Sequence, residues 1–124
     1  MPAYTLNHVH HETKDIETAV KFYQDLFGAT AEEPFVRGGA NWVIVHVGDV
    51  QVTVTDREFS DMELGRYQGL DHFALTTDDF EATLADIERL GVNIWFGPIQ
   101  VENGPRILFV SGPDHIKIEL MEKV

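Results

Sequence analysis

The chain has 124 residues, of which 44% are hydrophobic and 24% charged, so it can bury the core of one ordinary domain. Its formal net charge of -12 argues against a nucleic-acid partner, because such binding depends on clustered Lys and Arg. The chain has no cysteine, which excludes disulfides and thiolate metal sites.

A secretory signal or a membrane-spanning segment in the sequence would indicate the cellular compartment. Residues 1–6 supply neither the basic start nor the apolar stretch of a secretory signal, and no apolar run approaches the roughly 20 residues that cross a bilayer. We therefore expect a cytoplasmic protein that has no membrane partner.

Two segments, residues 8–17 and 72–81, repeat each other at a distance of 64 positions, with His, Thr, Asp and Glu recurring in the same order. Each segment leads into apolar residues at three- to four-residue spacing, which predicts a helix. Gly28 and Gly91 follow the last apolar positions, so we expect the two helices to end there.

A hairpin is predicted after the first helix, because residues 42–47 and 50–56 alternate around Gly48-Asp49, a glycine-led two-residue turn. If Val47 opposes Val50, the valines of both strands share one face, which should cover the helix. The opposite, mixed face then carries Trp42, Ile44, His46, Gln51, Thr53 and Thr55.

The second copy contains a matching hairpin, with strands at residues 106–111 and 115–121 around a turn at 112–114. We expect its core face to consist of Ile107, Phe109, Ile118 and Leu120. The residues expected to look the other way are Arg106, Leu108, Lys117, Glu119 and Met121.

These elements predict an α+β fold of two tandem βαβββ modules, forming an open, cup-shaped mixed sheet with the helices outside. Module one spans residues 1–56, a polar connector spans 57–68, and module two spans 69–124, within a single domain of residues 1–124.

His8 and His72 are related by the repeat, and both should face the cup. Glu119 lies among core residues of its strand, where a half-buried carboxylate needs a partner. A metal ion that is also held by two imidazoles would be an adequate one. We therefore predict His8, His72 and Glu119 as the ligands of one divalent metal ion.

The motifs at residues 6–9, 22–28, 70–75 and 112–120 resemble the vicinal oxygen chelate superfamily. That group includes glyoxalases, extradiol dioxygenases, methylmalonyl-CoA epimerases, fosfomycin-modifying enzymes and bleomycin-binding proteins. The resemblance implies paired modules, often in a homodimer, and matches His8, His72 and Glu119 to the family's metal ligands. Thr53 stands where glyoxalases carry a fourth, glutamate ligand.

Two histidines and a carboxylate form the facial triad of non-haem Fe(II) oxygenases, so Fe2+ is favoured, with Mn2+, Ni2+ or Zn2+ possible. We expect a metal-dependent enzyme that chelates a small, oxygen-rich organic substrate, with a ring-cleaving dioxygenase preferred. A glyoxalase-like or epimerase-like isomerase is one alternative. A non-catalytic binder of an antibiotic or other small molecule is another.

Further residues complete the predicted site. His10 and His46 are the candidate acid-base catalysts, whereas His11 should face the helix or a dimer edge in a structural role. A shift in strand register would make Gln51 a fourth metal ligand, which would favour proton transfer next to a carbonyl. The residues expected to contact the substrate are Trp42, Gln51, Thr53, Arg106 and Lys117.

Overall fold

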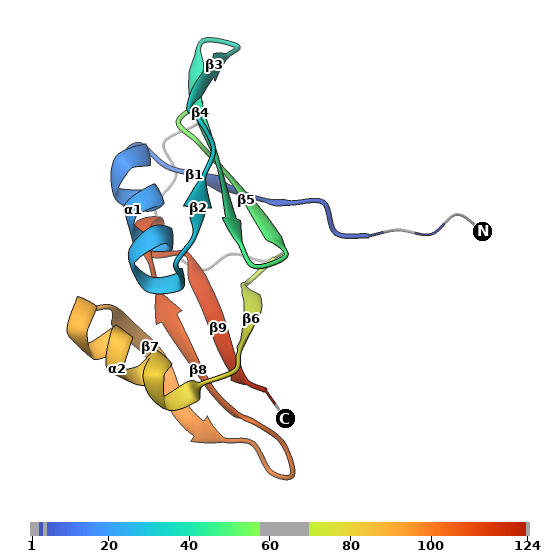
Figure 1. Ribbon diagram of the computed structural model, residues 1–124, viewed down its shortest axis with the longest axis vertical. Helices are drawn as coiled ribbons and strands as arrows, with labels where there is room; N and C mark the ends of the chain where they lie inside the picture. Colours follow the sequence, from blue (N-terminus) through green and yellow to red (C-terminus); the bar gives the residue numbers. More distant parts are fainter. Residues whose placement is uncertain (1–2, 4, 58–69, 124) are drawn as a thin grey trace. The chain divides into compact units, whose positions relative to one another are not determined.

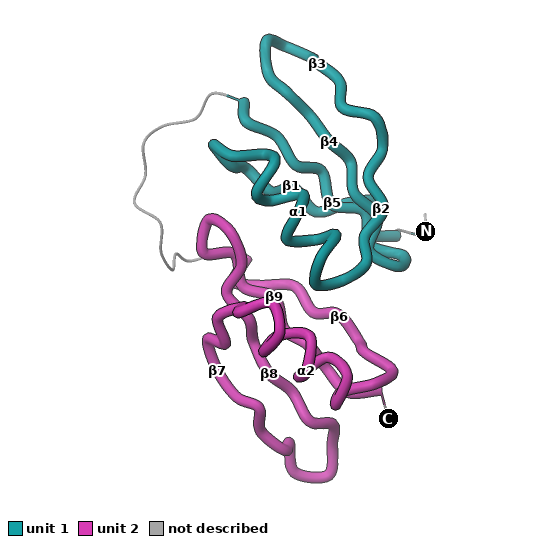
Figure 2. The backbone as a smooth tube through the Cα atoms, turned by 60° about the vertical axis from the view of Figure 1, so that its left-hand side comes forward, with its two compact units in different colours: residues 1–61 teal, residues 62–124 magenta. Residues whose placement is uncertain are grey.

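The computed structural model of the chain describes residues 3, 5–57 and 70–123 (Figure 1). It divides into two compact units, Met1–Asp61 and Met62–Val124, which Figure 2 shows in different colours. The connector predicted at residues 57–68 lies outside the described residues, apart from Arg57. Each unit is described by itself below.

Unit 1 contains one helix and one mixed sheet. Its elements are β1 (Val9–Glu12), α1 (Ile16–Phe27), β2 (Thr30–Ala31), β3 (Phe35–Arg37), β4 (Ala40–Val47) and β5 (Val50–Thr55). The strand order is β1-β5-β4-β2, and β3 also pairs with β4. β1 runs parallel to β5, and the other pairs are antiparallel.

Unit 2 repeats this plan. Its elements are β6 (Phe73–Thr77), α2 (Phe80–Leu90), β7 (Asn93–Gln100), β8 (Arg106–Ser111), the 3-10 turn η1 (Pro113–His115) and β9 (Lys117–Glu122). The order β6-β9-β8-β7 again places the first and last strands side by side and parallel. The predicted two-module α+β fold is confirmed, with β2 and β3 of unit 1 taking the place of the single strand β7.

The two helices begin and end as the sequence predicts. Asp15 accepts a hydrogen bond from the backbone N–H of Thr18 at 3.1 Å, and Asp79 accepts one from Ala82 at 3.0 Å. These carboxylates occupy N-cap positions, where they satisfy free donors of the first turn. Gly28 and Gly91 close the helices at φ +66°, a left-handed conformation that glycine adopts without steric cost. None of the helices in the described residues is long and apolar enough to span a bilayer.

The first hairpin has the predicted register, because Val47 pairs with Val50 across the Gly48-Asp49 turn. The face that covers α1 is accordingly built from the buried valines Val43, Val45, Val47, Val52 and Val54. Val50, at the end of this face, is only half-buried. His11 also lies on this side, where its Nδ1 is 2.9 Å from the Tyr23 hydroxyl. Its predicted orientation toward the helix is confirmed.

In the second hairpin the predicted faces of β9 are confirmed, whereas those of β8 are wrong. Ser111 pairs with Lys117, so residues 112–116 form the connection. A connection with an odd number of residues places the odd-numbered residues of β8 and β9 on one face, and the predicted three-residue turn at 112–114 would have done the same. The predicted faces of β8 followed the parity of a two-residue turn instead. The buried residues that share the core face are Leu108, Val110, Ile118 and Leu120. Ile107 and Phe109 therefore lie on the face of Glu119, whereas Arg106 and Leu108 lie on the opposite face.

Candidate metal site

His72 and Glu119 come together in unit 2. Ala74 pairs with Glu119 across β6 and β9, so the histidine that precedes β6 lies close to the carboxylate of β9. His72 Nε2 is 3.1 Å from Glu119 Oε1, and the two side chains are 31% and 15% exposed. An imidazole nitrogen and a carboxylate oxygen at this spacing are suitable ligands for a divalent transition metal.

The second ring nitrogen of His72, Nδ1, is held by the preceding residue in the chain. Asp71 Oδ2 lies 3.0 Å from His72 Nδ1. Lys117 Nζ donates to the second oxygen of the same carboxylate, Asp71 Oδ1, at 3.1 Å. The Phe109 ring meets the His72 ring edge-on at 4.8 Å between centroids, so one side of the pair is aromatic.

His8, the third predicted ligand, belongs to unit 1. Its Nδ1 is 2.7 Å from the side-chain oxygen of Asn7, which leaves Nε2 as the nitrogen available to a metal. Among the described residues, no three His, Asp or Glu side chains form a group that could hold a metal ion. The convergence of His8 with His72 and Glu119 therefore stays a prediction, while the donor types of the three residues fit a divalent ion.

Strand register identifies the unit 1 equivalent of Glu119. His10 pairs with Thr53 in the parallel β1–β5 ladder, just as Ala74 pairs with Glu119 in β6–β9. Because His10 and Ala74 are repeat partners, Thr53 is equivalent to Glu119. The register shift that would exchange Thr53 for Gln51 is not observed, since Gln51 pairs with His46 as expected. Thr53 is a buried, neutral hydroxyl at this position.

The mixed face of unit 1 carries His10. Its ring meets Trp42 edge-on at 5.5 Å, and its Nε2 is 3.3 Å from Glu12 Oε1. That nitrogen is shielded from solvent and has no hydrogen-bond partner in the described part of the chain. Burial lowers the pKa of His10 from 6.5, and the nearby Glu12 charge opposes this effect in part. The neutral imidazole, which can accept a proton, is therefore favoured near pH 7.

The remaining histidine candidate lies further out. His46 shares the face of Gln51 and Thr53, but its Nε2 is 2.5 Å from Glu32 Oε2 and its side chain is 41% exposed. This contact with Glu32 accounts for His46 as a surface residue, and it gives the predicted catalytic role of His46 no support.

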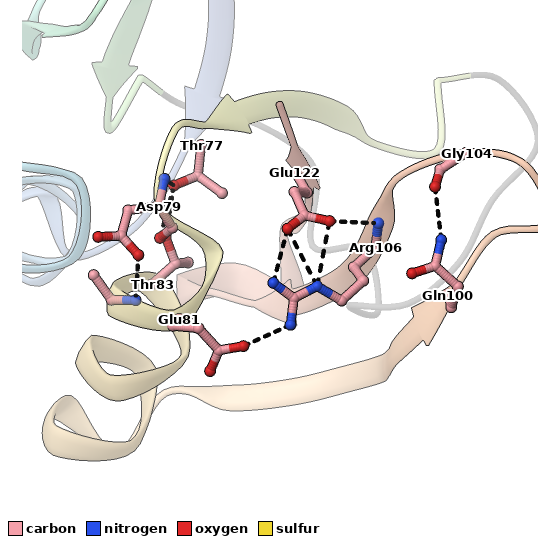
Figure 3. Close-up of polar contacts among 9 residues, drawn as sticks. Thr77, Asp79, Glu81, Thr83, Gln100, Gly104, Arg106 and Glu122 are labelled. Carbon is pink, nitrogen blue, oxygen red and sulfur yellow. Dashed lines mark hydrogen bonds and ion pairs between the residues drawn. The ribbon is translucent and has the colours of Figure 1, made fainter. Parts of the chain in front are cut away.

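Arg106 occupies a different surface from the one predicted (Figure 3). It donates to Glu122 Oε2 at 2.7 Å and to Glu81 Oε1 of α2 at 2.6 Å, and its guanidinium lies 4.6 Å from the Phe80 ring centre. The hydrogen bonds from Arg106 lower the pKa of Glu122. The prediction that Arg106 shares the face of Glu119 is wrong, and we do not retain it as a substrate contact.

Lys117 lies on the face of Glu119, as predicted, with its side chain only 10% exposed. Its ammonium contacts Asp71 and lies 4.3 Å from the centre of the Trp95 ring. The predicted contact between Lys117 and the substrate remains a prediction. In the structure, Lys117 donates a hydrogen bond to Asp71 and so helps to hold that carboxylate in place.

Sequence reasoning missed Asn7 and Asp71 as functional candidates. Each precedes a predicted ligand histidine, and each contacts Nδ1 of that histidine. The signal was available, because the two positions are also 64 residues apart and both carry a side-chain oxygen.

The two units, each a helix with a sheet whose first and last strands pair in parallel, define a two-module α+β protein. The chain belongs to the Glyoxalase/Bleomycin resistance protein/Dioxygenase superfamily, whose family model matches residues 5–120. This family includes proteins with a divalent metal ion and small-molecule substrates.

Comparison with known structures supports the same fold. A glyoxalase/bleomycin resistance protein/dioxygenase domain from Frankia sp. EAN1pec superimposes with a TM-score of 0.84 and 15% identity, covering 99% of this chain and 94% of that one. The fosfomycin resistance protein FosX from Listeria monocytogenes gives a TM-score of 0.79 at 17% identity, covering 97% and 94%. At these identities, the likeness establishes the fold alone.

A curated relative is the mitochondrial methylmalonyl-CoA epimerase of Mus musculus, which is 27% identical over 92 residues. The alignment covers 68% of this chain and 52% of the relative, so the chain spans about half the length of that protein.

Proposed function

We propose that the protein is a metal-dependent enzyme in which His8, His72 and Glu119 bind one divalent ion. The observation that carries this proposal is the pairing of His72 Nε2 with Glu119 Oε1 at 3.1 Å, while Asp71 engages the other ring nitrogen. A divalent ion held there would polarise two adjacent oxygens of a small organic substrate and stabilise the negative charge that develops on them.

The reaction that we favour is proton transfer at a carbon next to a carbonyl group, as in an isomerase or epimerase. Two observations support it: the curated relative is named an epimerase, and His10 is an imidazole on the mixed face of unit 1, where it pairs with Thr53. In this proposal, His10 Nε2 accepts the substrate proton and returns it, a role suited to a neutral imidazole.

The Fe2+-dependent ring-cleaving reaction is the second candidate. It is favoured by Thr53, which places a neutral hydroxyl at the position equivalent to Glu119. Without a fourth anionic ligand, the site keeps the open positions that a facial triad offers to substrate and dioxygen.

One set of assays separates the two candidates. The protein is first loaded anaerobically with Fe2+, Mn2+, Co2+, Ni2+ or Zn2+. One assay then offers it carbonyl thioesters in D2O, and a separate assay offers it catechols together with oxygen. We expect deuterium exchange next to the carbonyl, and we expect His10→Gln to slow it at least about 100-fold. His46→Gln is the matched control and should leave the rate unchanged. Oxygen uptake with catechols and no exchange would instead support ring cleavage, and neither activity would favour a binding protein.

The fourth position can be tested separately. Thr53→Glu should add an anionic ligand and tighten divalent-metal binding, whereas Gln51→Ala should leave it unchanged. Loss of metal from the Gln51 variant, together with no effect at Thr53, would show that the proposed ligand set is misassigned.

We also propose that the chain forms a homodimer. The edge strand β7 of unit 2 exposes large apolar side chains, including Trp95 and Phe96 at 46% each and Ile99 at 42%. Exposed apolar patches of this kind mark association surfaces. Sedimentation velocity at micromolar concentration should detect a dimer, and a monomer would contradict this part of the proposal.

A further inference from the structure

Asn7 and Asp71 are repeat partners that make the same contact. Asn7 Oδ1 is 2.7 Å from His8 Nδ1, and Asp71 Oδ2 is 3.0 Å from His72 Nδ1. We infer that both are positioning residues for the metal-binding histidines, and that the carboxylate of Asp71 makes His72 the stronger ligand of the two. This inference rests on the proposed metal site.

The geometry explains how such a residue acts. An imidazole ring that is held at Nδ1 presents Nε2 away from the holding group, so the contact fixes which nitrogen meets a metal. His72 Nε2 lies 3.1 Å from Glu119 Oε1, so the nitrogen left open by Asp71 is next to the second proposed ligand. A rotation of the ring would break the contact with Asp71.

Asp71 is itself held in place. Lys117 Nζ donates to Asp71 Oδ1 at 3.1 Å, while Asp71 Oδ2 faces His72, so both carboxylate oxygens are engaged. The ammonium of Lys117 also lies 4.3 Å from the centre of the Trp95 ring, and its side chain is only 10% exposed. Lys117, Asp71, His72 and Glu119 therefore form one continuous chain of contacts.

The same four positions exist in unit 1 with neutral side chains in place of the charged ones. Val52 pairs with Val9 and Ile118 pairs with Phe73, and Val9 and Phe73 are repeat partners. The neighbours of Val52 are therefore equivalent to those of Ile118: Gln51 to Lys117 and Thr53 to Glu119. The unit 2 set consists of Asp71, His72, Lys117 and Glu119, and the unit 1 set consists of Asn7, His8, Gln51 and Thr53.

This difference has a chemical consequence. A carboxylate that accepts the Nδ1–H proton of a ligand histidine fixes the tautomer and increases the basicity of the other nitrogen. Hydrogen bonds with an ionised partner are roughly twice as strong as neutral ones, so the amide of Asn7 should do less. Removing such a supporting group typically weakens metal affinity about 10- to 100-fold.

The test measures Co2+ affinity of the full chain by chelator competition at one fixed pH. We expect Asp71→Asn, which copies the unit 1 pairing, to weaken binding at least about 10-fold. Asp78→Asn removes the same charge from an exposed position of unit 2 and should leave the affinity unchanged. Asn7→Asp should tighten binding. Equal affinities of Asp71→Asn and Asp78→Asn, or no gain from Asn7→Asp, would overturn the inference.

A second readout needs no variant. In the Zn2+-loaded wild-type protein, NMR should show a His72 Nδ1–H proton that exchanges slowly with water because Asp71 accepts it, and absence of this signal would overturn the positioning role. Failure of the wild type to bind either metal would overturn the proposed function and this inference together. Tight binding that is insensitive to Asp71→Asn would overturn the inference alone.

Discussion

The two units build the same scaffold and place different chemistry on it. Both begin their helix at an aspartate N-cap, end it at a left-handed glycine, and pair their first strand with their last. Around the predicted ligand histidines, unit 2 has Asp71 and Glu119 where unit 1 has Asn7 and Thr53. The repeat therefore keeps the same backbone signals in both units, while the side chains on the mixed faces differ.

The cores of the two units also differ. In unit 1, the buried residues His11 and Tyr23 interact through a hydrogen bond of 2.9 Å. The positions 64 residues later carry the apolar residues Leu75 and Ile87, and Ile87 is buried. Apolar burial and a buried polar pair respond differently to substitution, which makes the comparison testable.

The largest effect on stability is expected at Ile87, which is 2% exposed. Ile87→Ala removes buried methyl and methylene groups and leaves a cavity, so it should lower the free energy of unfolding by about 2–5 kcal/mol. Urea denaturation followed by circular dichroism measures the change. Glu88→Ala, an exposed position of the same helix, should stay within about 0.5 kcal/mol. A similar loss for both variants would show that α2 is not anchored through Ile87.

A smaller effect is expected at the polar pair of unit 1. Tyr23→Phe removes the hydroxyl that contacts His11 Nδ1 in a buried environment, and should cost about 1–3 kcal/mol in the same urea experiment. The double variant His11→Leu/Tyr23→Phe replaces both partners with apolar groups, as in unit 2, and should recover part of that loss. A double variant less stable than Tyr23→Phe would mean that His11 stabilises unit 1 through other contacts.

The smallest effect concerns pH. Hydrogen bonds from the Thr18 hydroxyl and backbone N–H lower the pKa of Asp15 below 3.8. Because the unfolded chain binds the proton more readily, the contribution of Asp15 is fully present above pH 3.8 and is lost as the pH falls through the lower, folded pKa. Thermal unfolding between about pH 5 and 2 should therefore show a shallower decline for Asp15→Asn than for the wild type. Parallel curves would contradict this assignment.

Most of the fold could be predicted from local signals. The repeat at 64 residues, the helical spacing and the capping residues predicted both helices and their ends, and Gly48-Asp49 fixed the first hairpin. The faces of β8 were misassigned, because they were deduced as if the turn had two residues. The predicted turn at 112–114 and the observed connection at 112–116 both contain an odd number of residues, which places Phe109 and Glu119 on one face. The segment also contains Asp114 and His115 at positive φ, a conformation that Asp and His adopt more often than most other non-glycine residues.

The site was predictable only in part. Alternation in strands places residues on a face, which was enough to group His72 with Glu119 in unit 2. It does not say which side chain engages the second nitrogen of a histidine, so the contacts of Asp71 and Lys117 required atomic positions. Arg106 was misplaced because its face followed from the wrong parity of β8.

The most direct test of the account is metal analysis of the wild-type chain and four variants, all purified without chelator. The account predicts a stoichiometric divalent metal in the wild type and in His46→Ala, the surface control. It predicts loss of that metal in His8→Ala, His72→Ala and Glu119→Ala, with circular dichroism showing that each variant is folded. Full metal occupancy in folded Glu119→Ala protein would contradict the central claim.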